Sequence, residues 1–139
     1  APASAKSKGY VFKYKGVSVT MNGAAKKLIK KAGKPSKKTV KKSCAYKGKD
    51  RTYTYKDFQL KTYSKTNNGA EYVSEIRFRS NKAVTKEGIR IGSSLKAVTK
   101  KYGKAKARFG VYTFKKGSSK LQIMLNGNKV SAIRYFASK

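Results

Sequence analysis

Two short stretches decide the fold that the sequence predicts: YVSEIRFRS at residues 72–80 and KVSAIRYFAS at residues 129–138. Both contain a Val-Ser-x-Ile-Arg-aromatic phrase, in which apolar and polar residues alternate as in a half-buried β-strand. Strict alternation divides the first stretch into two faces. One face has Tyr72, Ser74, Ile76 and Phe78, and the other has Val73, Glu75, Arg77 and Arg79. In the second stretch the same rule sets Ile133 and Tyr135 against Val130, Ala132 and Arg134. We expect the Ile and aromatic face to be buried in both strands.

Further upstream the chain aligns with itself without a gap. VTMNGAAKKLIKKAGKP at residues 19–35 lies over IRIGSSLKAVTKKYGKA at residues 89–105. In the first copy the apolar residues Ala25, Leu28, Ile29 and Ala32 recur at i, i+3, i+4 and i+7. Leu95, Val98, Thr99 and Tyr102 take these positions in the second copy, so each copy predicts one short amphipathic helix. Asn22 and either Ser93 or Ser94 are the expected N-caps, and Gly33 and Gly103 the expected helix ends.

Each predicted helix is followed by strand signals. TYTYKDFQLKTY indicates two strands before the turn NNG at residues 67–69, and the second copy indicates three strands separated by KKGSS and NGN. YVFKYKGVSV, with Gly16 at its bend, predicts an opening hairpin. The expected class is α+β: two tandem helix-plus-antiparallel-strands repeats (about residues 10–82 and 83–139) forming one sheet in a single domain, with both helices on one face.

Charge is the strongest compositional signal. The 139 residues include 36 Lys and Arg against 5 Asp and Glu, a net charge of +31. Such a field favours polyanions: a cell-wall polymer, a glycan, a nucleic acid or an acidic protein. Of the basic residues 30 are Lys and 6 are Arg, which favours a general surface property over a dedicated nucleic-acid site, because specific readers rely on the planar Arg fork. No stretch approaches the roughly 18 apolar residues of a membrane span.

The phrase I-x-I-G-x-S-x-x-x-V-x-x-x-Y-G at residues 89–103 resembles the opening of repeats in the β-lactamase-inhibitor-protein-like (SmpA/OmlA-like) group. With SCAYKGKDRTYTY at residues 43–55, the chain also resembles a family of secreted proteins or lipoproteins of gut Firmicutes. These resemblances imply a small secreted or envelope protein, and the first implies an inhibitor or adaptor that binds another protein. The opening APASAKSKG is similar to the tail left by signal-peptide cleavage, so residues 1–9 are expected to be flexible and the protein secreted or associated with the cell surface.

Residue types argue against catalysis. The sequence contains no His, the commonest general base and transition-metal ligand. Cys44 is the only cysteine. The nearby Lys41, Lys42 and Lys47 could lower the pKa of its thiol and make it a nucleophile. A buried packing role is favoured, because free cysteines are commonly buried as small apolar residues. We therefore expect no enzyme, no cofactor and no metal site.

The candidate ligand-binding surface is the open face of the sheet. Arg77 and Arg134 are expected there in equivalent places, beside Gln59 and Gln122 from neighbouring strands. Tyr53, Tyr55 and Tyr112 are candidate ring contributors to the same surface. Two alternatives without a binding role stay open. In one, the face is only the solvated side of a two-layer domain. In the other, the lysine coat, natural or engineered, serves solubility alone. The expected function is a non-catalytic binding module for anionic ligands or surfaces; the alternative is a protein-binding inhibitor or adaptor.

Overall fold

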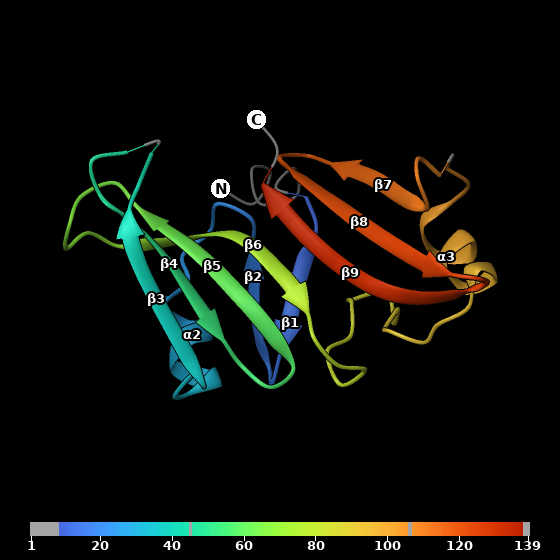
Figure 1. Cartoon of the computed structure of the whole chain (residues 1–139), viewed down its shortest axis with the longest axis horizontal. Helices are drawn as coiled ribbons and strands as arrows, with labels where there is room; N and C mark the ends of the chain where they lie inside the picture. Colours follow the sequence, from blue (N-terminus) through green and yellow to red (C-terminus); the bar gives the residue numbers. More distant parts are fainter. Residues whose placement is uncertain (1–8, 45, 106, 138–139) are drawn as a thin grey trace.

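The computed structural model describes residues 9–44, 46–105 and 107–137 (Figure 1). Seven antiparallel strands form one sheet in the order β3-β4-β5-β6-β9-β8-β7. Across the sheet these are β3 (Lys37–Lys42), β4 (Lys49–Thr54), β5 (Phe58–Ser64), β6 (Glu71–Phe78), β9 (Lys129–Ala137), β8 (Ser119–Asn126) and β7 (Val111–Lys116). A hairpin of β1 (Val11–Tyr14) and β2 (Val17–Thr20) forms a second sheet. The two helices of the described residues are α2 (Lys26–Ala32) and α3 (Leu95–Tyr102).

The expected α+β class with two helix-plus-strand repeats is wrong. The fold is 49% strand and 12% helix, so it is a mostly-β protein. The helices have seven and eight residues, which makes each about 10–12 Å long. Seven strands spaced by about 4.8 Å span roughly 29 Å, so two such helices cannot form a layer over them. Helical periodicity predicted the positions of both helices correctly. The expectation that they cover one face of the sheet was wrong, because they are too short.

The β1–β2 hairpin covers the middle of the sheet instead. It lies behind β5 and β6 (Figure 1), and its Phe12 is fully buried. The Phe12 ring centroid lies 5.3 Å from that of Phe58 and 5.5 Å from that of Phe78. The ring of Tyr135 on β9 lies 6.4 Å away. An aromatic cluster therefore joins the two halves of the sheet beneath the β6–β9 contact.

The repeated Val-Ser phrase forms a β-bulge in both strands. The pairing of β5 with β6 runs Lys61 to Glu75 and then Thr62 to Val73, which leaves Ser74 as the extra residue. In β9, Ser131 is the extra residue opposite β8. Each serine hydroxyl donates to a partner-strand carbonyl, Ser74 to Lys61 at 3.1 Å and Ser131 to Met124 at 3.3 Å. A bulge inverts the alternation, so Val73 and Val130 are buried with the isoleucines, contrary to the predicted faces.

The predicted helix caps are half right. Ser94 is the N-cap of α3, and its hydroxyl accepts from the Ala97 N–H at 3.1 Å. Asn22 is not the N-cap of α2: the helix begins after Ala25, without a side-chain cap. The backbone before α2 pairs with the start of β6 through an Ala24–Tyr72 bridge, which delays the first turn. Gly33 and Gly103 end the helices at positive φ, as expected.

The segment KKTVKKSCAYKGKDR contains an unpredicted edge strand. All six residues of β3 are exposed, which is typical of an edge strand protected by lysine. Cys44 follows this strand and is an exposed free thiol, so its expected buried packing role is wrong. Cys44 lies just after the edge strand of the sheet, and its own side chain is exposed there.

The start of the described chain is fixed to the β7–β8 turn. The Tyr10 N–H donates to the Ser119 hydroxyl at 2.8 Å. Gly9 has a φ of +97°, and a Cβ there would lie 2.3 Å from the Lys116 carbonyl oxygen. Gly9 therefore packs closely, whereas residues 1–8 of the expected tail lie outside the described residues. The expected boundary between residues 82 and 83 falls in the connection from β6 to α3.

Candidate functional site

A row of polar side chains crosses the open face of the sheet. Arg77 on β6 lies directly opposite Arg134 on β9. Gln59 flanks Arg77 from β5, and Gln122 flanks Arg134 from β8. The row continues to Thr54 on β4 and Lys37 on β3 at one side, and to Thr113 on β7 at the other. The four polar residues named from the sequence therefore lie side by side.

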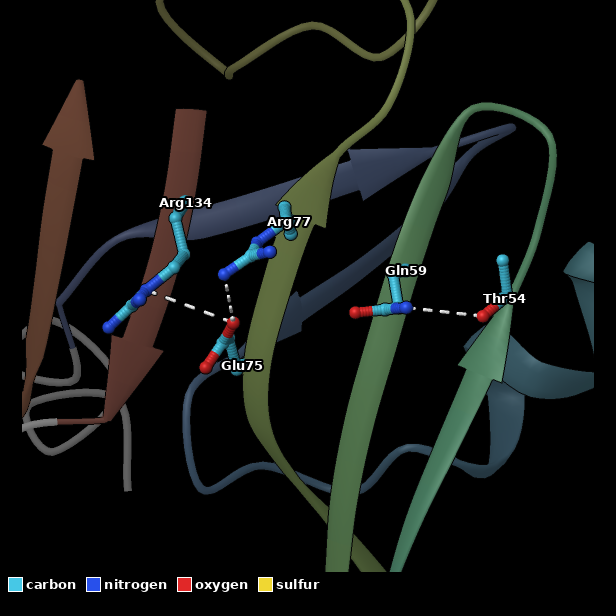
Figure 2. Close-up of polar contacts among 5 residues, drawn as sticks. All are labelled: Thr54, Gln59, Glu75, Arg77 and Arg134. Carbon is cyan, nitrogen blue, oxygen red and sulfur yellow. Dashed lines mark hydrogen bonds and ion pairs between the residues drawn. The ribbon is translucent and has the colours of Figure 1, made fainter. Parts of the chain in front are cut away.

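One carboxylate faces both arginines. Figure 2 shows the side chains of Arg77 and Arg134 turned toward Glu75 from neighbouring strands. The Glu75 Oε2 atom lies 3.8 Å from Nη2 of Arg77 and 3.8 Å from Nε of Arg134. These are the ion pairs of the described residues. Two guanidinium charges against one carboxylate leave a net positive charge at the centre of the row.

The central arginines differ from two other arginines of the sheet in their hydrogen bonding. Arg51 donates to the Ser64 hydroxyl and the Asn67 carbonyl, and Arg79 donates to the Tyr55 carbonyl. Within the described part of the chain no hydrogen bond from Arg77 or Arg134 is formed, and Nε of Arg134 is buried. Arg134 is held instead over the ring of Phe136, at 4.5 Å from its centroid. Among the described residues, the two guanidinium groups are therefore held by their ion pairs with Glu75 rather than by hydrogen bonds.

The three tyrosines named from the sequence do not lie on the open face. Tyr53 and Tyr55 are buried, with 3% and 6% of their surfaces exposed, and they flank Thr54 on the core side of β4. Tyr112 pairs with the fully buried Ile123 and packs against the core. The pairing of Thr54 with Gln59 explains the error. Since Thr54 lies on the open face with Gln59, its neighbours Tyr53 and Tyr55 point toward the core.

A different set of tyrosines does lie on the open face. Tyr63 and Tyr72 pair across β5 and β6 with ring centroids 5.6 Å apart. Tyr46 stacks on Tyr63 at 5.0 Å and is 41% exposed. Tyr63 lies four residues after Gln59 on β5, so strand alternation alone places it on the same face as Gln59. Alternation places Tyr72 on the wrong face, because the bulge at Ser74 inverts the pattern in β6.

A hollow of about 200 Å³ lies beside the arginine pair. β6 and β9 pair only as far as Arg77 and Arg134 and then separate. Met124 and Ala132 line the hollow on the open face, with Gln122 and both arginines also at its surface. Phe78 and Ile133 border it, but both are buried in the core. Met124 is 45% exposed, so its side chain offers apolar surface at the mouth of the hollow.

Lysines line a second hollow at the β3 edge. Its walls include Lys41, Lys42, Lys47 and Lys49, and its volume is about 560 Å³. No described lysine forms an ion pair, since both ion pairs belong to arginine. Four lysines around one concavity concentrate positive charge there.

Most of the acidic residues are engaged inside the protein. Glu71 accepts from the hydroxyls of Tyr53 and Thr62, both at 2.7 Å. Glu87 accepts from Tyr102 at 2.8 Å, and Asp57 accepts from Ser80 at 2.8 Å. Among residues 9–44, 46–105 and 107–137, no cluster of His, Cys, Asp and Glu is suited to hold a metal ion. In the same residues no helix is long and apolar enough to cross a membrane.

Buried tyrosines carry the large pKa shifts of the molecule. Burial raises the pKa of Tyr135 well above its usual value, and the neighbouring Tyr102 and Glu87 raise it further. Burial also raises the pKa of Tyr53, which donates to Glu71. These hydroxyls therefore stay protonated at neutral pH and act as structural groups of the core.

The comparisons with known proteins place the chain in no family. No protein-family model matches it, and neither a curated protein nor a solved structure matches it.

Proposed function

We propose that this protein is a non-catalytic binding module for anionic polymers or surfaces, acting outside the cell or at its surface. The observation that carries the proposal is the pair of directly opposed arginines at the centre of the open face. Like charges directly opposite each other destabilise a sheet, and Glu75 offsets only one of the two. A surface that keeps this arrangement is suited to an anionic partner.

The surroundings of the pair support the same class of ligand. The net charge of +31 attracts polyanions over long distances. Acidic residues do little to offset the lysine coat, because the chain has only 5 of them against 36 lysines and arginines. Tyr46 and Tyr63 add exposed or partly exposed rings on which bases or sugars can stack. Tethering through many weak cationic contacts needs no general base, metal or nucleophile.

Heparin titration at several salt concentrations tests this proposal. If six or more lysines and arginines contact the polymer, affinity should fall about 10³-fold between 50 and 200 mM salt. The variant Arg77→Gln/Arg134→Gln should weaken heparin binding about tenfold and reduce the salt dependence by about two released ions. Thermal melting of the variant checks that the sheet is intact.

The matched control is Lys30→Gln/Lys31→Gln. It removes the same charge from the last turn of α2, which packs through Leu28 against the core side of the sheet. We expect less than a threefold loss of heparin affinity in this variant. Equal losses in both double variants would refute the sheet-face site and leave a diffuse lysine coat. Weak salt dependence with tight binding to a folded protein would instead support the alternative function, a protein-binding inhibitor or adaptor.

A further inference from the structure

The hollow and the Glu75 carboxylate lie on opposite sides of the arginine pair, because of how β6 and β9 are arranged. The two strands run antiparallel, and Arg77 and Arg134 pair at their contact. Glu75 stands two residues before Arg77, and Ala132 stands two residues before Arg134. The two positions therefore lie on opposite sides of the arginine pair. One holds a carboxylate, and the other holds a methyl group.

Replacement of a carboxylate by a methyl group leaves space on the Ala132 side. The hollow is open there because Ala132 fills little of the gap where β6 and β9 separate. On the Glu75 side, the carboxylate contacts both guanidinium groups. An external carboxylate in the hollow would occupy the equivalent position on the other side of the pair, where the second positive charge is not offset.

The lining of the hollow defines the rest of the ligand. Met124 and Ala132 provide apolar surface next to the arginines. The Gln122 side-chain amide forms no hydrogen bond within the described residues. Its counterpart Gln59 donates to Thr54 at 3.2 Å (Figure 2). A volume of about 200 Å³ lies below the range of drug-sized ligands. The site therefore suits a small acid with a short apolar body.

We propose that this hollow binds a small organic carboxylate, with its charge between Arg77 and Arg134 and its apolar chain against Met124 and Ala132. This deepens the proposed function, since it rests on the same arginine pair. It differs from polymer binding in requiring one anion and one apolar group in a shaped site. Salt should therefore weaken it far less than it weakens heparin binding.

Hexanoate is the probe, and calorimetric titration is the measurement. Acetate has the charge without the chain, hexanol has the chain without the charge, and inorganic phosphate is an anion without apolar surface. Each buried methylene improves affinity by about threefold to fourfold, so hexanoate should bind at least tenfold more tightly than acetate. Hexanol and phosphate should both bind at least tenfold more weakly than hexanoate. Equal binding of hexanol and hexanoate, or of phosphate and hexanoate, would overturn the proposal.

Ala132→Glu and Ala132→Gln form the decisive pair of variants. Glu at this position supplies the missing carboxylate, so it should abolish hexanoate binding and raise the melting temperature. Gln fills the same volume without charge, so it should weaken hexanoate binding without raising the melting temperature. Unchanged hexanoate affinity in both variants would place the binding elsewhere and refute the proposal.

Heparin binding by the same variants separates this inference from the proposed function. Ala132→Gln should retain heparin affinity within threefold of the unmodified protein, because it removes no cation. Retained heparin binding without hexanoate binding in the unmodified protein would refute the carboxylate site alone. Loss of heparin binding in Arg77→Gln/Arg134→Gln, with hexanoate binding unchanged, would support the polymer site and refute the carboxylate site.

Discussion

The β6 and β9 phrases fold alike, and on the open face they differ where Glu75 stands in one strand and Ala132 in the other. Both strands bulge at the serine, bury the preceding valine and fully bury the isoleucine. Beyond these shared positions, β6 closes one side of the arginine pair with a carboxylate and β9 leaves a hollow on the other. The difference shows that the shared phrase builds the sheet, whereas a single unshared position shapes the surface.

The largest expected effect tests what the two phrases share. Ile76→Ala and Ile133→Ala should each reduce the free energy of unfolding by about 2–5 kcal/mol, because both side chains are fully buried. Urea denaturation measures both losses. Met124→Ala is the control on the same sheet; with 45% of its surface exposed, it should lose clearly less. A loss below about 1 kcal/mol at either isoleucine would contradict the common role.

The next effect concerns the position that the phrases do not share. Glu75→Gln should reduce the free energy of unfolding by about 1–2 kcal/mol, since it leaves two opposed arginines without a carboxylate between them. Asp50→Asn is the charge-matched control, on β4 and outside the arginine pair. Equal losses would mean that the effect reflects only the higher net charge. Chemical denaturation at low salt gives the clearest measurement, because salt screens the repulsion.

A second difference between the phrases lies at the aromatic position, where β6 has Phe78 and β9 has Tyr135. Burial raises the pKa of Tyr135 above its unfolded value of 10.0. The protonated hydroxyl therefore contributes stability that is present below pH 10 and lost as the pH rises above it. At pH 11 the unmodified protein should lose at most about 1.4 kcal/mol more than Tyr135→Phe, relative to pH 8. Urea denaturation at both pH values measures this, and identical pH profiles would contradict it.

The smallest expected effect distinguishes the two bulges. Ser74→Ala should reduce the free energy of unfolding by about 1 kcal/mol, because its partly buried hydroxyl donates to Lys61. Ser131→Ala should lose about half as much, since its contact with Met124 is longer and exposed. Thermal melting of both variants, with Ser18→Ala on the hairpin as an exposed control, gives the comparison. A larger loss of unfolding free energy in Ser131→Ala than in Ser74→Ala would contradict this prediction.

Sequence patterns predicted much of the local structure. The opening hairpin, most strands of both halves, a cap at Ser93 or Ser94 and a shared face for Arg77 and Arg134 follow from periodicity, capping and turn chemistry. The structure selects Ser94 as the cap and pairs the two arginines directly. The patterns failed where one extra residue inverts the alternation, as at Val73, and where strand pairing turns a side chain inward, as at Tyr53. They also missed β3, because an exposed lysine-rich edge strand has no buried face to reveal it.

The sequence alone determined the composition of the surface and the existence of two matching strands, because charge and short-range periodicity are local properties of the chain. Only the tertiary structure decided that these strands pair with each other, that the hairpin rather than the helices covers the centre of the sheet, and that Glu75 and the hollow lie on opposite sides of one arginine pair. The physical reason is that β-sheet contacts join residues far apart in the chain, and one bulge changes which side chains face the core.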